Sequence, residues 1–451
     1  MFKNYFKTAW RNLGRNKAYS IINVFGLTLG IASCIVIYLV VQYELSYDRF
    51  NSKADRTYRV TLNAIDFNPS VSMAIAPAMR NDFPELEAVS QAWYRESGLI
   101  TIAGNRYDEK GIVFADKYFP AVFDYQWLKG DSKTALAEPN TIVLTKTTSR
   151  KYFGDSEPIG KIINLDNKYD LKVSGIIDDV PGNTHLPFNS LVSFETVTND
   201  VKGMMSQFFA IPGGSFAYIV TPENSRVSQF QDRIKGFIAK NWGADVAKDA
   251  NLLLQPLTDI HFDQRYLNNT ISYTTSRNTY FALSAVAMLI LVIACINFIN
   301  LATARAIRRA KEVGVRKVLG SNRGQLVIQF LTETGLMVVS ALVLGLLVTF
   351  FFLPLVSRWM EMKMNFSQLM DPSVILWVLT LTVVVILLAG LYPAFVQSAF
   401  NPAASLKSKT PSSYKGLTLR KALVVLQFAI SQVMIVGTLV VAYQMDYFQN
   451  R

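Results

Sequence analysis

The stretch of the sequence closest to a nucleotide-binding motif runs from Gly154 to Lys161. A phosphate loop needs four residues between its two glycines, and a Ser or Thr after its Lys, to surround the phosphates and hold magnesium. Here five residues separate Gly154 from Gly160, and Ile162 stands where the hydroxyl is needed. We interpret the stretch as a turn before a strand, and no phosphate-loop sequence occurs elsewhere in the chain.

Side chains suited to other chemistry are scarce. The chain has two histidines, His185 and His261, and two cysteines, Cys34 and Cys295, which both lie in apolar runs. This excludes a disulfide framework in the polar part and leaves little room for a histidine-based metal site or catalytic triad. The adjacent acids Asp178-Asp179 are typical of a solvated turn. We therefore predict no catalytic residue, no cofactor and no metal site.

One basic segment, Ala304–Gly320, has an unusual composition. Its residues favour helix, and Gly320 suits a left-handed C-terminal cap. Asn322, with a Gln three residues later, predicts the start of the next helix. We expect a short helix followed by a turn. Anchoring by basic residues would explain the Lys and Arg, but not Glu312 or Gly314, which favour neither anchoring nor helix stability.

Five segments are long and apolar enough to cross a membrane. A spanning helix needs about 20 mainly apolar residues, and none of the five carries a charge in its interior. Buried helices of soluble proteins are rarely so long and uncharged, so the chain is predicted to be a multi-pass α-helical membrane protein. The predicted spans are 19–42, 280–301, 335–355, 374–396 and 422–443.

Charges in the connecting segments predict the orientation. Residues 1–18, 302–334 and 397–421 together hold 17 basic and 2 acidic residues, whereas the rest of the chain holds 28 basic and 31 acidic. Basic loops stay in the cytoplasm, so these three segments are predicted to lie inside. The segments predicted outside are 43–279, 356–373 and 444–451. The net charge of +12 is therefore interpreted as a topology signal and not as a nucleic-acid-binding surface.

The first 18 residues are predicted to form an amphipathic helix at the membrane surface. Basic side chains recur every four positions, and an aromatic and apolar stripe adjoins them. The basic residues are Lys3, Lys7, Arg11 and Arg15, and the stripe consists of Phe2, Phe6, Trp10 and Leu13. Membrane lipid is the expected partner of this helix.

Two further features concern the membrane helices. Gly26-x-x-x-Gly30 in the first span supplies a small-residue face for close helix packing, which could be static or could take part in coupling. Glu333, Asn297 and Asn300 lie at the cytoplasmic ends of helices. They could orient these helices, but solvation at the membrane interface is the favoured interpretation.

Residues 43–279 are enough for one sizeable domain or two packed subdomains. Strand-like and helix-like stretches alternate, which predicts an α/β or α+β fold rather than an all-β one. Strands are expected at 57–62, 98–102, 141–144, 161–165, 171–177 and 216–220, and helices at 71–81, 147–153 and 225–240. Because no catalytic constellation stands out, we interpret this domain as a binding or mechanical module.

The basic segment carries a specific resemblance. Its residues Lys311, Glu312, Val313, Gly314, Val315, Arg316, Lys317 and Gly320 form a sequence that resembles the E-[IV]-G-[IV]-R-K-x-x-G signature of MacB/FtsX-type ABC transporter permeases. The resemblance implies that this segment contacts a separate ATPase subunit, which would be the main partner. It also implies a MacB-like periplasmic core domain for residues 43–279 and a place in the bacterial inner membrane.

The resemblance covers nearly the whole chain, in order and spacing. It includes Tyr47–Phe50, Tyr58–Val60, Ile142–Thr145, Tyr152–Gly154, Pro158–Lys161, Val173–Ile176, Leu391–Ala394 and Asn401–Ala403. The chain looks most similar to the duplicated permeases of Bacteroidota that lack a fused ATPase. This implies a dimeric or pseudo-dimeric permease, and it allows a periplasmic adaptor or an outer-membrane partner.

The fifth span departs from the family pattern, because one permease unit has four membrane helices. Both the first and the fifth spans follow basic residues, and Val440–Tyr443 resembles Val40–Tyr43. We therefore expect the chain to be the N-terminal part of a duplicated permease, in which residues 422–443 begin the second unit.

The leading hypothesis is a permease subunit that couples ATP hydrolysis by a separate ATPase to motion of the outer domain. Mechanical transmission of this kind would export peptide, drug or lipoprotein-type substrates. One alternative is an FtsX-like transducer that activates a periplasmic cell-wall hydrolase, and another is a membrane-anchored sensor or receptor. An anchored enzyme has the least support, because no catalytic constellation is found.

Overall fold

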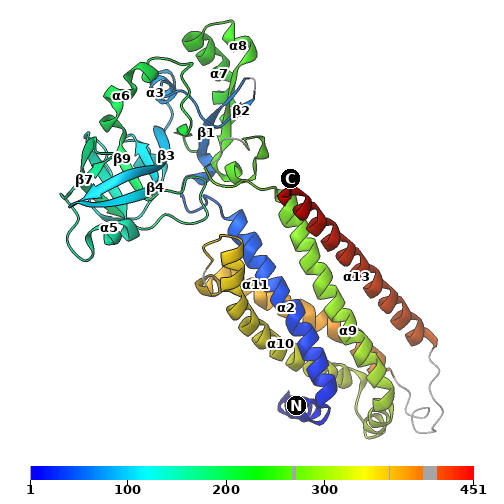
Figure 1. Ribbon diagram of the computed structural model, residues 1–451. Coiled ribbons are helices and arrows are strands. Elements are labelled where there is room, and N and C mark those ends of the chain that lie inside the picture. Colours follow the sequence, from blue (N-terminus) through cyan, green and yellow to red (C-terminus); the bar gives the residue numbers. More distant parts are fainter. Residues whose placement is uncertain (1, 65, 267–270, 365, 400–413, 451) are drawn as a thin grey trace. The chain divides into compact units, whose positions relative to one another are not determined.

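A computed structural model of the chain describes residues 2–64, 66–266, 271–364, 366–399 and 414–450. The chain divides into two compact units (Figure 1). The membrane unit joins Met1–Tyr43 to Asn278–Arg451, and the outer domain is Glu44–Arg277. Part of the predicted inward loop 397–421, residues 400–413, lies outside the described residues.

The membrane unit is built from long helices. Within the described residues, five of them are long and apolar enough to span a membrane, which confirms the predicted number. They are α2 (Lys17–Leu45), α9 (Arg277–Val318), α10 (Arg323–Trp359), α11 (Pro372–Ser398) and α13 (Tyr414–Gln449). Helix α1 (Phe2–Arg15) precedes them, and the 3-10 helix η5 (Phe366–Met370) follows α10. Helices α2, α9, α10 and α11 lie side by side (Figure 1), whereas the most apolar stretch of α13 has no buried residue.

Small residues mark where these helices approach most closely. A Cβ atom added to Gly30 of α2 would lie 2.9 Å from Cβ of Ala294 in α9. A Cβ atom added to Gly390 of α11 would lie 3.0 Å from Leu331 of α10, whereas one added to Gly345 of α10 would meet α2 at an ordinary contact distance of 3.4 Å. A Cβ atom at Gly26 would have no described neighbour within 4 Å. Of the two glycines predicted to pack helices, Gly30 therefore lies in a helix contact, and Gly26 has no such contact with the described part of the chain.

This difference gives a matched pair of variants. Gly30→Val is expected to destabilise the membrane unit by about 1–3 kcal/mol, because the added side chain overpacks the contact with α9. Gly26→Val makes the same change of residue type in the same helix, where nothing described would be displaced. The measurement is thermal unfolding of the purified chain in detergent. Equal losses in the two variants would contradict the packing role of Gly30.

Helix α9 continues without a break through the segment where a separate short helix is expected. It spans 42 residues and ends at Val318. One glycine, Gly314, lies in its last two turns and costs only about 1 kcal/mol relative to Ala. That cost is too small to end a helix whose neighbours Ala310 and Val313 are buried at 5% and 1% exposure.

The turn after α9 follows the prediction. Gly320 has φ +96°, the left-handed conformation expected of a C-terminal cap. The Asn322 side chain accepts a hydrogen bond from the backbone N–H of Gln325 at 2.9 Å, and the Gln325 side chain accepts one from the N–H of Asn322 at 3.1 Å. This capping box starts α10.

The outer domain contains a mixed sheet, which confirms the predicted α/β class. Its strands run in the order β11-β1-β10-β3-β4-β9-β6-β8-β5, with β2 paired to β1 and β7 paired to β3 and β8. The pairs β4–β9 and β6–β8 are parallel and the others are antiparallel. The strands are β1 (Thr57–Asn63), β2 (Phe67–Asn68), β3 (Ala88–Ile102), β4 (Asn105–Ala115), β5 (Trp127–Lys129), β6 (Thr141–Thr145), β7 (Ile162–Leu165), β8 (Tyr169–Ile177), β9 (Ser190–Ser193), β10 (Ser215–Val220) and β11 (Asn251–Pro256).

Helices cover the sheet and close its core. Apolar side chains of α3 and α7 form one buried cluster with β1, β10 and β11, and a second cluster lies among β4, β6, β7 and β8. The helices are α3 (Ile75–Asp82), α4 (Phe119–Val122), α5 (Lys146–Phe153), α6 (Thr198–Met205), α7 (Val227–Trp242) and α8 (Val246–Asp249). The 3-10 helices are η1 (Ala54–Arg56), η2 (Phe194–Thr196), η3 (Leu257–Phe262) and η4 (Gln264–Tyr266).

Each of the six expected strands overlaps an observed strand, but β2, β4, β5, β9 and β11 were not expected. Only the last third of β3 was expected, and the polar residues Ser90 and Gln91 lie in the part that was missed. Both are buried: Ser90 donates to Asp116 at 2.8 Å, and Gln91 donates to Ser215 at 2.9 Å. Their partners lie far away in the sequence, so local pattern could not identify them.

Candidate coupling site

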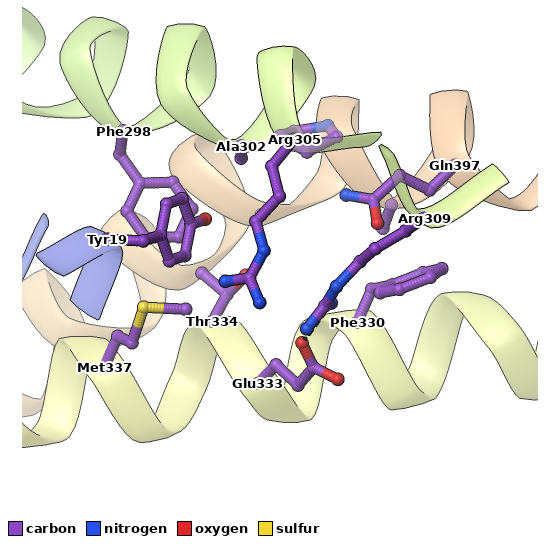
Figure 2. Close-up of a pocket in the computed structure, with 13 residues that line it drawn as sticks. Tyr19, Phe298, Ala302, Arg305, Arg309, Phe330, Glu333, Thr334, Met337 and Gln397 are labelled. Carbon is purple, nitrogen blue, oxygen red and sulfur yellow. Dashed lines mark hydrogen bonds and ion pairs between the residues drawn. The ribbon is translucent and has the colours of Figure 1, made fainter. Parts of the chain in front are cut away.

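A buried carboxylate joins three helices near the turn between α9 and α10. Oε1 of Glu333 in α10 accepts a hydrogen bond from Nδ2 of Asn12 in α1 at 2.8 Å. Oε2 of Glu333 accepts one from Nη1 of Arg309 in α9 at 2.7 Å (Figure 2). The side chains of Glu333 and Arg309 are only 8% and 12% exposed. Such a pair holds its helices firmly, because removing one partner leaves an uncompensated charge in a buried place.

The interpretation of Glu333 as a solvated helix-end residue is therefore wrong. Its separation from Asn12 is 321 residues, so no local pattern could reveal their contact. The only signal was an acid isolated among basic residues close to an apolar span. Asn297, by contrast, is exposed, and Asn300 is half-buried.

A small cavity of about 20 Å³ lies beside this ion pair. Its wall includes Tyr19, Arg305 and Gln397 (Figure 2), and the Arg305 guanidinium lies 4.5 Å from the centroid of the Tyr19 ring. A space of this size holds about one water molecule and is too small for a substrate. The described residues also contain no cluster of His, Cys, Asp and Glu able to hold a metal ion. The arrangement is a structural junction and not a ligand pocket.

The residues predicted to contact the ATPase, 311–320, are here named the coupling segment. Part of this segment faces the helix bundle. Val313 is 1% exposed and packs with Leu326 and Phe330 of α10 and with Ala394 of α11. Gly314 is buried as well. Neither residue is placed to touch another protein directly, so any part they have in coupling would come from packing α9 onto α10.

The opposite side of the segment is exposed and partly apolar. Val315, Val318 and Leu319 are 47%, 66% and 80% exposed. They lie beside Lys311 and Glu312, whose side chains are also exposed. Contiguous exposed apolar side chains with a polar rim are typical of protein-binding surfaces. Val318 and Leu319 were not among the predicted contact residues, because the family signature leaves their positions unspecified.

Polar contacts fix this surface to α10. Arg316 donates from Nη2 to Oε1 of Glu312 at 2.6 Å and from Nη1 to Oε1 of Gln329 at 3.0 Å. Glu312 and Arg316 are one helical turn apart, where a pair of this order stabilises a helix. Gln329 is 7% exposed, so it ties Arg316 to the buried side of α10. Lys317 and Gly320 complete the predicted segment in the last turn of α9 and the turn after it.

Comparison with known families finds matches in both units of the chain. Residues 20–237 match the family described as MacB-like periplasmic core domain. Residues 284–402 match the family described as FtsX-like permease C-terminal. The second match contains the coupling segment and the Arg309–Glu333 pair.

The curated relatives that the chain matches are longer proteins. The chain is 21% identical to the pyoverdine export ATP-binding/permease protein PvdT of Pseudomonas syringae pv. syringae, over 72% of this chain and 48% of that protein. It is 23% identical to the macrolide export ATP-binding/permease protein MacB of Bdellovibrio bacteriovorus, over 59% of this chain and 38% of that protein. The chain thus spans half or less of the length of these relatives.

Among solved structures, the periplasmic region of MacB from Actinobacillus actinomycetemcomitans aligns with 45% of this chain and 89% of its own length. The identity is 12% and the TM-score is 0.34.

Proposed function

Because the chain is a permease of the MacB/FtsX type with a MacB-like periplasmic core domain, we propose that it serves as the membrane subunit of an ABC transporter. A separate ATPase subunit binds the turn between α9 and α10 and moves these helices. The observation that carries this proposal is the exposed surface formed by Glu312, Val315, Val318 and Leu319. It combines apolar area with charge, as protein interfaces do.

The contacts behind that surface support a mechanical role. Leu319 directly follows α9, which runs unbroken from Arg277 to Val318. A force applied to Leu319 would therefore act on the whole of this helix. The Arg316–Gln329 bond and the Arg309–Glu333 pair then carry the displacement into α10, and Asn12 carries it into α1. These helices would shift together when the ATPase changes shape.

The proposed setting is the bacterial inner membrane, with the N-terminus inside. Exposed Phe6 and Trp10 of α1, at 55% and 64% exposure, suit contact with membrane lipid. The side chains of residues 1–4, including Lys3, lie outside the described residues. A second permease unit, beginning with α13, or a second copy of the chain would complete a dimeric arrangement. A peptide, drug or lipoprotein-type substrate, and a periplasmic adaptor or outer-membrane partner, fit this proposal.

The proposal is tested by co-purifying the full chain with its cognate ATPase. Leu319→Asp is expected to lower the recovered ATPase at least tenfold, because it places a charge at the centre of the apolar surface. Glu312→Lys should act in the same direction by reversing the charge beside it. Both variants should insert in the membrane at the normal level.

Met360→Asp is the matched control, because Met360 is an exposed apolar residue in the turn at the other end of α10. Its ATPase recovery should equal that of the unaltered chain. Full recovery with both Leu319→Asp and Glu312→Lys would exclude this surface as the ATPase contact.

A further inference from the structure

The five residues at which the chain leaves α2, residues 44–48, are here named the exit segment. They are the first residues of the outer domain. Two of them are acids, Glu44 and Asp48, and both are completely buried. A buried carboxylate costs several kcal/mol unless other groups compensate its charge. The groups that do so therefore determine how the exit segment is held.

Glu44 is held by a histidine and a tyrosine from the end of the domain. Nε2 of His261, in η3, lies 2.6 Å from Oε2 of Glu44, and the Tyr273 hydroxyl donates to Oε1. Burial and the Glu44 carboxylate raise the pKa of Tyr273, so its hydroxyl keeps the proton that it donates. The ring of Tyr47 stacks on the His261 ring with centroids 3.5 Å apart. Glu44 thus contacts the edge of the His261 ring, and Tyr47 packs against its face.

Asp48 is held by the other histidine. Nδ1 of His185 lies 3.0 Å from Oδ1 of Asp48, at ion-pair distance though too oblique for a hydrogen bond. The same carboxylate accepts bonds from the Thr184 hydroxyl at 2.8 Å and from the backbone N–H of His185. Nε2 of His185 lies 2.8 Å from the hydroxyl of Tyr218 in β10. These contacts tie the exit segment to the central part of the sheet.

Backbone geometry adds a third constraint. Asp48 has φ +58°, an uncommon conformation for a residue with a side chain. Its N–H donates to the carbonyl of Asn183 at 2.9 Å, and the Asn183 side chain donates to the carbonyl of Ser46 at 3.1 Å. The exit segment therefore has little freedom to turn independently of the domain.

The chain has only two histidines, and both bind acids of this one segment. They reach it from sequence separations of 137 and 217 residues. Histidines placed only for core stability would have no reason to meet at the point where the chain leaves a membrane helix. We infer that the Glu44–His261 and Asp48–His185 pairs form a rigid joint through which movement of α2 is passed to the outer domain. All four are positioning residues, and their role rests on the proposed function, in which ATP moves the helices.

The test uses the full chain with its ATPase in lipid nanodiscs. Spin labels at Ile162→Cys in the outer domain and Glu361→Cys after α10 report the distance between the two units with and without ATP. Both native cysteines are buried. The double variant Glu44→Gln/Asp48→Asn removes both charges but keeps side-chain shape, and Asn tolerates the positive φ at position 48.

Glu109→Gln is the matched control, because Glu109 is also a buried acid of the outer domain, at 4% exposure. Lys151 and Tyr152 each donate a hydrogen bond to it at 2.6 Å, and both of these partners lie in α5, outside the exit segment. The unaltered chain and the control should show the same ATP-dependent change in label distance. The double variant should show less than half of it while recovering the same amount of ATPase. If the ATP-dependent change in label distance were the same in the double variant, the proposal of a rigid joint would be overturned.

Hydrogen exchange separates failure of the joint from failure of the proposed function. If the unaltered chain binds no ATPase or does not respond to ATP, the proposed function fails and the joint is judged on exchange alone. The Asp48 amide, which donates to Asn183, should then exchange about 100-fold faster in the double variant than in Glu109→Gln, as expected when the carboxylate acceptors of the buried hydrogen bonds are removed. Equal exchange in the two variants would refute the joint independently of any ATPase.

Discussion

Replacing Glu333 by Gln is expected to destabilise the membrane unit by about 3 kcal/mol, the lower end of the cost of breaking a buried ion pair. The amide fills the same space and can still bind Asn12, but it leaves the guanidinium of Arg309 buried at 12% exposure without a counter-charge. Unfolding of the purified chain in detergent, followed by the loss of helical signal, measures this change. Few single substitutions outside the apolar core should cost as much.

A second variant keeps this prediction specific to the charge pair. Glu333→Leu combined with Arg309→Met replaces both charges by apolar side chains, and its stability should return to within about 1 kcal/mol of the unaltered chain. If the double variant were as unstable as Glu333→Gln, the cost would come from packing and not from the unpaired Arg309. If Glu333→Gln left the stability unchanged, the Arg309–Glu333 pair would not stabilise the packing of the three helices.

The second large effect, a loss of ATPase binding, is expected from Gly314→Pro. Proline removes the hydrogen bond from this N–H to the carbonyl of Ala310 and clashes with that carbonyl, which costs about 3 kcal/mol or more within a helix. Helix α9 should therefore bend or end one turn early, and Val318 and Leu319 should move from their positions on the exposed side of the segment. ATPase recovery with the full chain is expected to fall about 100-fold, while membrane insertion remains normal.

Gly314→Ala is the control, because Ala favours the helix by about 1 kcal/mol and keeps the backbone bond. This variant should recover ATPase at close to the normal level. Normal recovery with Gly314→Pro would show that the orientation of the last turn of α9 is unimportant for the contact.

Local signals explain which parts of this structure could be predicted. The spans follow from long apolar runs, and the turn between α9 and α10 follows from Gly320 and the Asn322–Gln325 capping box, whose partners are three residues apart. On the exposed side of the coupling segment, Glu312 and Val315 belong to the family signature, and their contact with an ATPase stays a prediction. Val318 and Leu319 could be identified only from their exposure in the folded chain.

The polar interior could not be predicted, because its partners lie far apart in the sequence. Asn12 and Glu333 meet across 321 residues, and each alone resembles a solvated residue near a membrane surface. The scarcity of histidine gave no indication of which residues the two histidines contact. His185 contacts Asp48 and His261 contacts Glu44. These contacts form only in the folded domain, because the partners are far apart in the sequence.

The unbroken course of α9 has one further consequence. Its 42 residues make a rod about 63 Å long, roughly twice the thickness of the hydrocarbon core. A rod of this kind fixes the distance between its two ends. It also fixes the angle about the helix axis between the side chains at one end and those at the other. Each residue added to or removed from it would turn the face carrying Glu312 by about 100° relative to the first turn after Arg277. The number of residues in α9 is therefore as strict a constraint as their apolar character.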